Sequence, residues 1–374
     1  MITNVSIFVN YIKEGGGPMG YTYNLIQGLS KLKNDKLHVT FHEINIIHKL
    51  NKSSSFLCII SRCARKIKTI RKSIYLKSVI NKSHICIFQG YQDEKLSSYA
   101  RKLHKINVYM PHSPSIMADE QRMLYELKNT ILSTKEYNVI LNNEEKLIKN
   151  ADYLIFPSVH SNSAYMEKWA DLITTKKVHY LKSGTIIRNN INEKCIQINN
   201  ANKLVIAFIG RYVTHKGFDI FCKAADFLSY NDRFYFICAG DGPLKNLIPQ
   251  NVHNLGFVKN IGAIIQQCNL IIIANKITYY DLLPIECAAY GLPLIYSDNG
   301  GNIDQAKEFT DSLLFKTNSV DSLAETIEKA ADMIMTNSDW GQINKTTYLH
   351  DFTETKFAQR WLDFINMIIS EHMI

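Results

Sequence analysis

The sequence lacks a long apolar segment. No stretch of its 374 residues approaches the roughly 20 apolar residues that a membrane-spanning helix needs. It also has no basic region ahead of its first apolar run, at residues 5–9, so that run predicts a first buried strand and not a signal peptide. A chain of this length with 46% hydrophobic residues suits two domains, each with its own core.

Metal-binding patterns are missing as well. The eight cysteines are scattered without a Cys-x-x-Cys pair or paired histidines, and no convincing Asp-x-Asp motif ends a strand. Cys86, Cys238 and Cys287 fall in apolar segments, which predicts buried thiols. We therefore expect a reducing cytoplasm and no structural zinc.

Acidic residues are absent from residues 52–82, and this absence accounts for the net charge of +9. The segment carries nine Lys and Arg residues interleaved with apolar ones, while the remaining 34 basic and 34 acidic residues of the chain balance. A basic helix with one apolar face is typical of binding to an anionic membrane surface. The alternative is a solvated helix whose apolar stripe packs on the N-terminal sheet. Because no nucleic-acid fold or aromatic–basic stacking pattern is recognisable, we expect no nucleic acid partner.

The most informative residues lie between 204 and 301. An apolar run at 204–209 leads into Gly210-Arg211, and Lys216-Gly217 follow. If the run is a strand, both cations lie at the carboxyl edge of a sheet, where open α/β folds bind ligands. Two fixed cations there, with glycines that let the backbone come close, suit a diphosphate.

The remaining apolar runs predict strands that alternate with helices, which indicates parallel sheets. In the C-terminal half we expect strands at 234–238, 255–258 and 270–274, and helices at 218–228 and 261–268. In the N-terminal half we expect strands at 37–41, 85–89, 106–110, 153–156 and 178–181, and two helices within 118–150.

Four groups of residues together resemble one family. They are Gly210-Arg211-x-x-x-x-Lys216-Gly217, Ala239-Gly-Asp-Gly242, Asn251-Val-x-Asn-Leu-Gly256, and Leu283-Pro-Ile-Glu286-Cys-Ala-Ala-Tyr-Gly-Leu-Pro293 followed by Gly300-Gly301. The set looks like the nucleotide-sugar half of glycosyltransferase family 4, and it is dense over residues 204–305 and thinner elsewhere. The resemblance implies the α/β GT-B fold, in which two Rossmann-like parallel-sheet domains face each other across a cleft.

The resemblance also implies the domain limits. Residues 1–184 would form an acceptor-binding domain, residues 185–354 a nucleotide-sugar-binding domain, and residues 355–374 a helix that packs back on the first domain. The polar, Asn-rich stretch 188–202 is consistent with a crossing between the domains.

In such enzymes Arg211 and Lys216 would hold the donor diphosphate and stabilise the charge that builds on the leaving β-phosphate. They would take the place of a metal, so we expect neither a metal nor another cofactor. Glu286 would accept the donor ribose hydroxyls, and the backbone near Phe257 and Val258 would contact the base. The simpler interpretations are surface cations on a β–α loop and, for Glu286, favourable charge near a helix N-terminus.

The sequence departs from the family pattern at the sugar end of the site. Thr278 stands where the family usually has a second Glu, and Tyr279 and Asp281 replace small residues. Either the donor sugar is unusual and is read by these residues, or catalysis is weakened or absent. The predicted nucleotide-sugar contacts on this segment are Thr278, Asp281, Leu282, Leu283 and Glu286.

Gly15-Gly16-Gly17-Pro18-Met19-Gly20 follows the first predicted strand and opens a helix, where backbone N–H groups and the helix N-terminus attract anions. The resemblance implies that Gly16 and Gly17 face the donor phosphates across the cleft. The same residues match the dinucleotide pattern G-x-G-x-x-G, with Glu43 as the ribose ligand. The long loop at 10–14 counts against that alternative, and a purely structural turn is the third.

His112 lies in Met110-Pro111-His112-Ser113-Pro114, just after a predicted strand. In the family a histidine at the corresponding strand end contacts the transferred sugar, and the flanking prolines would stiffen its loop. The alternative is a loop histidine that hydrogen-bonds to the backbone.

These observations predict a retaining glycosyltransferase that transfers a hexose-type sugar from a nucleotide-diphosphate donor to a glycan or lipid-linked acceptor of a bacterial surface polysaccharide. The catalytic candidates are His112, Arg211, Lys216 and Glu286. We expect it in the cytoplasm, peripheral on the inner face of the cytoplasmic membrane through residues 52–82. The alternatives are a non-catalytic subunit that binds nucleotide sugar, and a sugar-nucleotide epimerase or dehydrogenase.

Overall fold

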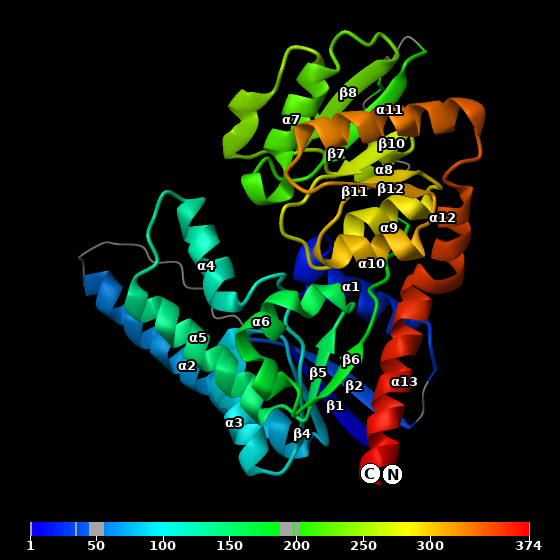
Figure 1. Ribbon diagram of the computed structural model, residues 1–374. Helices are drawn as coiled ribbons and strands as arrows, with labels where there is room; N and C mark the ends of the chain where they lie inside the picture. Colours follow the sequence, from blue (N-terminus) through cyan, green and yellow to red (C-terminus); the bar gives the residue numbers. More distant parts are fainter. Residues whose placement is uncertain (1, 34–35, 45–55, 188–196, 199–201, 374) are drawn as a thin grey trace.

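The computed structural model describes residues 2–33, 36–44, 56–187, 197–198 and 202–373, with the backbone alone at 56–68. Its elements form two α/β lobes, each built on one six-stranded sheet (Figure 1). Most of the predicted crossing at 188–202, and residues 52–55 of the basic segment, lie outside the described residues.

The N-terminal sheet has the order β2-β1-β3-β4-β5-β6, and all its neighbouring strands are parallel. Its strands are β1 (Thr3–Val9), β2 (Leu37–Glu43), β3 (Ile85–Phe88), β4 (Ile106–Tyr109), β5 (Tyr153–Phe156) and β6 (Lys177–Tyr180). Its helices are α1 (Gly17–Ser30), α2 (Phe56–Lys82), α3 (Glu94–Lys102), α4 (Met117–Glu126), α5 (Thr134–Asn150) and α6 (Ser163–Ile173), with short 3₁₀ turns at Tyr91–Asp93 and His160–Asn162. Strands β3 and β5 are buried on both faces, which is why they read as continuous apolar runs, and the equally buried β4 differs only at Asn107.

The C-terminal sheet has the order β12-β11-β10-β7-β8-β9 and is also wholly parallel. Its strands are β7 (Leu204–Ile209), β8 (Phe234–Ala239), β9 (Val252–Asn254), β10 (Leu270–Ile273), β11 (Leu294–Ser297) and β12 (Ser312–Phe315). Its helices are α7 (Phe218–Phe227), α8 (Ile261–Ile265), α9 (Leu282–Ala289), α10 (Gly300–Glu308), α11 (Val320–Thr336) and α12 (Gln342–Thr347), with short turns at Thr214–Lys216, Pro243–Leu247 and Tyr348–Phe352.

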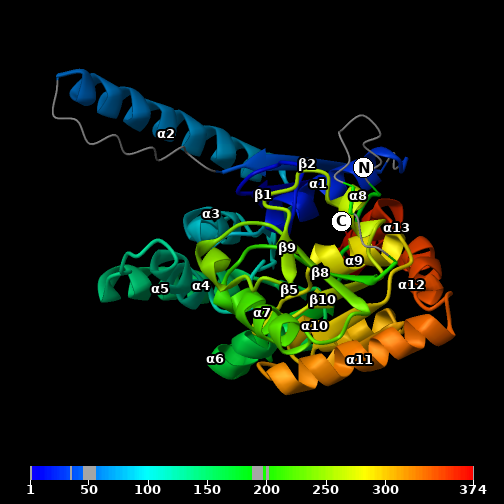
Figure 2. The same ribbon diagram turned by 90° about the horizontal axis from the view of Figure 1, so that it is seen from above.

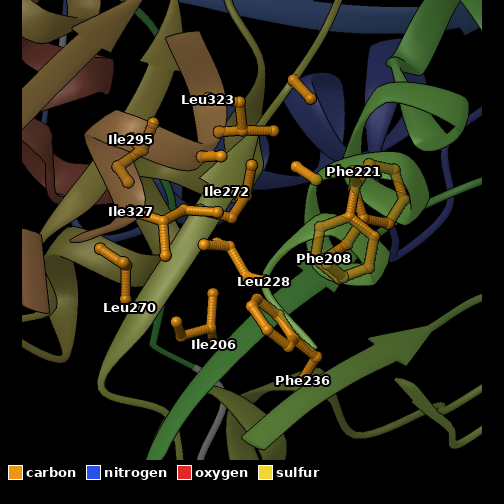
Figure 3. Packing of buried hydrophobic residues seen from close by; sticks show 14 of the residues in the cluster. Ile206, Phe208, Phe221, Leu228, Phe236, Leu270, Ile272, Ile295, Leu323 and Ile327 are labelled. Atoms are coloured by element: carbon orange, nitrogen blue, oxygen red, sulfur yellow. The ribbon is translucent and has the colours of Figure 1, made fainter. Parts of the chain in front are cut away.

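One of the two core layers of the C-terminal domain lies between this sheet and the helices α7 and α11. Phe208, Phe221 and Phe236 pack there with Ile272 and Leu323 (Figure 3). The rings of Phe208 and Phe221 lie 5.4 Å apart, and burial of each aromatic side chain removes about 150–250 Å² of surface from water. This layer fixes the position of β7, whose carboxyl end carries the predicted diphosphate cations.

The last helix, α13 (Glu354–His372), returns to the N-terminal domain as the sequence predicted and runs along its sheet (Figure 1). Its apolar face joins the core that contains Val5 and Leu25. The indole N–H of Trp361 donates a hydrogen bond to the Tyr21 hydroxyl over 2.9 Å, which ties α13 to α1. The chain thus crosses twice between the domains.

The prediction of a strand at residues 255–258 is wrong. Strand β9 ends at Asn254, and residues 255–258 form a loop at the edge of the sheet. The cause is local, because the side-chain oxygen of Asn254 accepts a hydrogen bond from the backbone N–H of Gly256 over 2.9 Å, which turns the chain. The turn leaves Phe257 82% exposed.

We expect Trp361→Ala to lower the free energy of unfolding by about 3–5 kcal/mol, because it opens a cavity in the N-terminal core and leaves the Tyr21 hydroxyl without its donor. Urea unfolding followed by circular dichroism measures the change. Asn366→Ala, an exposed position on the same helix, is the control and should stay within about 0.5 kcal/mol of the wild type. Equal stability of the two variants would contradict the docking role of α13.

Candidate functional site

A cavity of about 640 Å³ lies where the carboxyl ends of the C-terminal strands face the first loop of the N-terminal domain. Its volume falls in the roughly 300–1,000 Å³ range of small-molecule sites. The residues that line it include Gly16, Gly17, Arg211, Lys216, Phe257, Val258, Asp281, Leu282, Leu283 and Glu286. The structure therefore brings together nearly all the residues that the sequence predicted for nucleotide-sugar binding.

A second cavity of about 180 Å³ continues from the first. The two share Gly17, Arg211, Lys216, Asp281 and Leu282. The second cavity adds His112, Thr278 and Tyr279, the remaining residues of the predicted sugar end. A diphosphate held at the shared residues would thus have room for a nucleoside on one side and for a sugar on the other.

The loop after β7 owes its shape to a buried ring and a glycine. The Tyr212 ring is buried and stacks on Phe218 with centroids 4.0 Å apart. Gly217 has a φ of +69°, and a Cβ there would lie 1.8 Å from the carbonyl oxygen of Ala274. Only glycine allows α7 to begin so close to the end of β10. The loop between these two anchors therefore presents Arg211 and Lys216 at the cavity.

Lys216 does not face the cavity alone. Its ammonium group donates to Asp281 Oδ2 over 2.5 Å, and the Asn275 amide donates to the same oxygen over 2.6 Å. Burial would raise the pKa of Asp281, but Lys216 and the two hydrogen bonds outweigh burial and leave that pKa below its usual value. A lysine has three N–H donors, so Asp281 orients Lys216 and still leaves donors for a phosphate.

Arg211 is exposed, and one of its guanidinium nitrogens lies 3.3 Å from Nε2 of His215. Burial, and then the charges of Arg211 and Lys216, lower the pKa of His215 to about 4. At neutral pH His215 is therefore uncharged, and it positions Arg211 without adding a third cation.

His112 lies at the end of β4 with its ring edge-on to Tyr21, 4.7 Å between centroids. Burial lowers the pKa of His112 to about 4, so the imidazole is neutral at physiological pH. Its Nε2 has no hydrogen-bond partner among the residues that the structure describes. The alternative of a loop histidine bonded to the backbone through this atom therefore finds no support.

Two of the substituted residues at the sugar end make contacts that the sequence did not predict. The hydroxyl of the buried Thr278 donates to Asn302 over 3.1 Å, inside the C-terminal domain. The Tyr279 hydroxyl donates to the carbonyl of Pro111, and the ring packs on the core of the N-terminal domain. Tyr279 thus joins the domains next to His112, a role for which the sequence held no local signal.

A second contact between the domains lies farther along α10. Asp304 accepts hydrogen bonds from the backbone N–H of His160 over 2.8 Å and from its ring Nδ1 over 2.7 Å. Lys182 pairs with Glu308 on the same helix. These pairs, like Tyr279, hold the cleft at its present width.

The dinucleotide alternative finds no support in the N-terminal domain. Glu43, its expected ribose ligand, accepts a hydrogen bond from the backbone N–H of Ile12 over 2.8 Å and so fixes the long loop after β1. Gly16 and Gly17 line a cavity made mainly by the C-terminal domain. Among the residues that the structure describes, no cluster of three or more His, Cys, Asp or Glu side chains is arranged to hold a metal ion.

The class of protein follows from the fold. Two parallel six-stranded sheets with a ligand-sized cavity between their carboxyl edges, and a final helix that returns to the first domain, define the GT-B fold. Solved structures agree over nearly the whole length: sucrose-phosphate synthase from Thermosynechococcus elongatus has a TM-score of 0.68 at 15% identity, covering 99% of this chain and 100% of that one. Anabaena HepE in complex with UDP has a TM-score of 0.65 at 14% identity, and the match covers 98% of this chain and 100% of the HepE chain. At these identities the likeness establishes the fold alone.

The family resemblance is confirmed for the C-terminal domain, because residues 191–347 match the family described as "Glycosyl transferases group 1". One relative is UDP-Gal:alpha-D-GlcNAc-diphosphoundecaprenol alpha-1,3-galactosyltransferase of Escherichia coli, 24% identical over 210 residues, which are 52% of this chain and 51% of the relative. Another is N,N'-diacetylbacillosaminyl-diphospho-undecaprenol alpha-1,3-N-acetylgalactosaminyltransferase of Campylobacter jejuni, 23% identical over 177 residues, 46% and 47% of the two chains. The matches span about half the length of these relatives. The predicted glycosyltransferase is confirmed at the level of this family domain.

Below pH 6.5 we expect His112, which is partly buried and neutral in the folded chain, to make stability depend on pH. Between pH 6.5 and about pH 4, His112 binds a proton in the unfolded chain but not in the folded chain. The free energy of unfolding therefore decreases as the pH is lowered through this window, by at most about 3 kcal/mol for this residue. His112→Gln should make the pH profile of urea unfolding less steep between pH 6.5 and 4, and His215, whose pKa is also about 4, accounts for part of the slope that remains. The exposed control His253→Gln should leave the slope unchanged, and equal slopes in all three proteins would contradict the burial of a neutral His112.

Proposed function

We propose that the chain is a retaining glycosyltransferase that transfers a hexose-type sugar from a uridine diphosphate donor to a lipid-linked acceptor. One observation carries the proposal: a single cavity between the domains is lined by Arg211, Lys216 and Glu286 of the C-terminal domain and by Gly16 and Gly17 of the N-terminal domain. The choice of donor and acceptor is supported by relatives named for UDP-galactose and for diphosphoundecaprenol-linked sugars. HepE, of the same fold, binds UDP.

In the proposed reaction the acceptor hydroxyl oxygen forms a bond to the anomeric carbon while the bond from that carbon to the β-phosphate oxygen breaks. The bonding electron pair leaves with the diphosphate, and the hydroxyl proton ends on it. Arg211 and Lys216 stabilise the negative charge that grows on the leaving oxygen, more strongly in the transition state than before it. We propose that these cations serve without a metal ion.

A non-catalytic nucleotide-sugar-binding subunit is the second candidate, and a specific feature favours it. Thr278 replaces the acidic residue that the family usually has, and its hydroxyl donates a hydrogen bond to Asn302. Asp281 forms an ion pair with Lys216, one of the two cations proposed to bind the diphosphate. Such a subunit would bind nucleotide with no turnover, so a transfer assay separates the two candidates.

The acceptor type and the basic segment together support a peripheral position at the cytoplasmic face of the membrane. Helix α2 extends away from the rest of the molecule (Figure 2). Leu76 and Ile80 of its apolar stripe are buried against the N-terminal domain, but Ile70 and Ile74 are 50% and 64% exposed. The C-terminal end of the stripe thus packs on the N-terminal domain, as the alternative of a solvated helix predicted. The described residues nearer the N-terminus of α2 remain available to a lipid surface. Within the described residues, none of the helices is long and apolar enough to cross a bilayer.

Arg211→Ala and Lys216→Ala should each lower kcat/KM for the nucleotide sugar by about ten- to a hundredfold, because a hydrogen bond to a charged group contributes roughly 1.5–3 kcal/mol. Nucleotide release from a panel of UDP-, GDP- and dTDP-sugars measures the effect. Lys223→Ala, an exposed cation on the neighbouring helix α7, is the matched control. If both site variants keep the wild-type kcat/KM, the proposed roles of these cations are wrong.

The double substitution Arg71→Glu with Lys72→Glu should weaken binding to vesicles that contain phosphatidylglycerol by about thirtyfold or more, since each basic side chain near an anionic surface contributes about 1 kcal/mol. Co-sedimentation at low and high salt measures the binding, which should also weaken as salt rises. Lys329→Glu on α11, an exposed position of the other domain, is the control. Binding that depends neither on anionic lipid nor on salt would contradict the membrane role.

A further inference from the structure

A third cavity, of about 150 Å³, opens in the N-terminal domain at the carboxyl ends of β1, β3 and β4, between α1 and α4. This edge of a parallel sheet is where α/β domains bind ligands. His112, Glu120 and Pro18 line both this cavity and the second cleft cavity, which contains the shared cations. A ligand in the third cavity would therefore lie directly beside the sugar end of the donor site.

Two side chains of this cavity each have one buried nitrogen without a hydrogen-bond partner in the part of the chain that the structure describes. Gln89 is 6% exposed, and one end of its amide contacts the Thr22 hydroxyl over 3.4 Å. Its Nε2 has no hydrogen-bond partner among the described residues, and neither has Nε2 of His112. Whichever way the Gln89 amide is turned, one of its ends stays unpaired. Buried polar groups are seldom left so in folded proteins, and both groups belong to a cavity that a polar ligand could fill.

Glu120, on α4, supplies the one charge of the cavity among the described residues that line it. Burial raises the pKa of Glu120, while a hydrogen bond from Ser113 and the charge of Arg211 act in the opposite direction. A carboxylate accepts hydrogen bonds from hydroxyl groups but repels a phosphate or a carboxylate. With neither Lys nor Arg in the described lining, nothing there would offset that repulsion.

The size of the cavity narrows the choice of ligand. Its 150 Å³ lies well below the roughly 300–1,000 Å³ of sites for drug-sized molecules, so it suits one ring and not a chain of rings. Tyr11 and Tyr91 add two aromatic side chains to a lining that also contains several amides. Amides, hydroxyls, aromatic side chains and one carboxylate match the donors, acceptors and apolar face of a single sugar.

We propose that this cavity binds the terminal sugar ring of the acceptor, and that this ring carries no negative charge. Its hydroxyls are held by Gln89, His112 and Glu120, with the attacking hydroxyl directed into the adjoining donor cavity. The proposal rests on the proposed transferase function and names the acceptor class for it. Gln89 and Glu120 act as positioning residues, and the proton of the reaction still leaves with the diphosphate.

The test uses the full chain with methyl glycosides of neutral sugars and of glucuronic acid, observed by saturation-transfer NMR with and without UDP. We expect at least one neutral glycoside to bind and the glucuronide not to bind. Glu120→Gln and Gln89→Met should each weaken the binding of the neutral glycoside about tenfold or more. The matched controls Glu126→Gln, exposed on the same helix, and Gln359→Met, exposed on α13, should bind as the wild type does.

The inference is overturned if no neutral glycoside binds the wild type, if Glu120→Gln and Gln89→Met bind as tightly as their controls, or if the glucuronide binds best. Thermal unfolding of each variant shows whether its fold is intact. Because Glu120→Gln and Gln89→Met are independent substitutions, the test still stands if one of these variants misfolds. Calorimetry with UDP distinguishes a failure of the proposed transferase function from a failure of the proposed acceptor site. A wild type that binds glycosides but no nucleotide contradicts the proposed function, whereas nucleotide binding with unaffected variants contradicts only the acceptor site.

Discussion

The placement of two parallel sheets with their carboxyl edges toward each other is the constraint on which the whole site depends. Helix α13 enforces it by leaving the C-terminal domain and packing into the core of the first, where Trp361 bonds to Tyr21. Tyr279 and Asp304 make hydrogen bonds across the cleft itself. Because strand ends gather loops from many parts of the chain at one edge, this arrangement turns scattered glycines and cations into one continuous cavity.

Charge in that cavity is more evenly balanced than two cations alone would make it. Asp281 neutralises part of Lys216, and His215 stays uncharged beside Arg211. Such pairing holds flexible side chains in place before a ligand arrives, so less conformational freedom is lost on binding.

Local patterns predicted the fold well. The strands β7, β8 and β10 lie within one residue of the expected limits, because buried parallel strands are continuous apolar runs. The strand expected at 255–258 failed because a side chain of the preceding strand, Asn254, turns the chain by a hydrogen bond that apolar patterning does not register. Most of the candidate site was found from glycine, cation and carboxylate spacing. Glu120 and Gln89, which line the third cavity, were not predicted, because they lie on separate parts of the fold with no shared motif.

The sequence by itself determined two parallel-sheet domains and the loop that carries Arg211 and Lys216, since each depends on neighbours within a few residues. Only the tertiary structure decided how those parts meet: that Lys216 pairs with Asp281, that Tyr279 reaches Pro111, and that Gln89 and His112 line one cavity, each with a nitrogen that has no hydrogen-bond partner among the described residues. These contacts join residues from about 65 to 168 positions apart, or different strand ends. Their existence depends on packing and on the angle between domains, which no local pattern encodes.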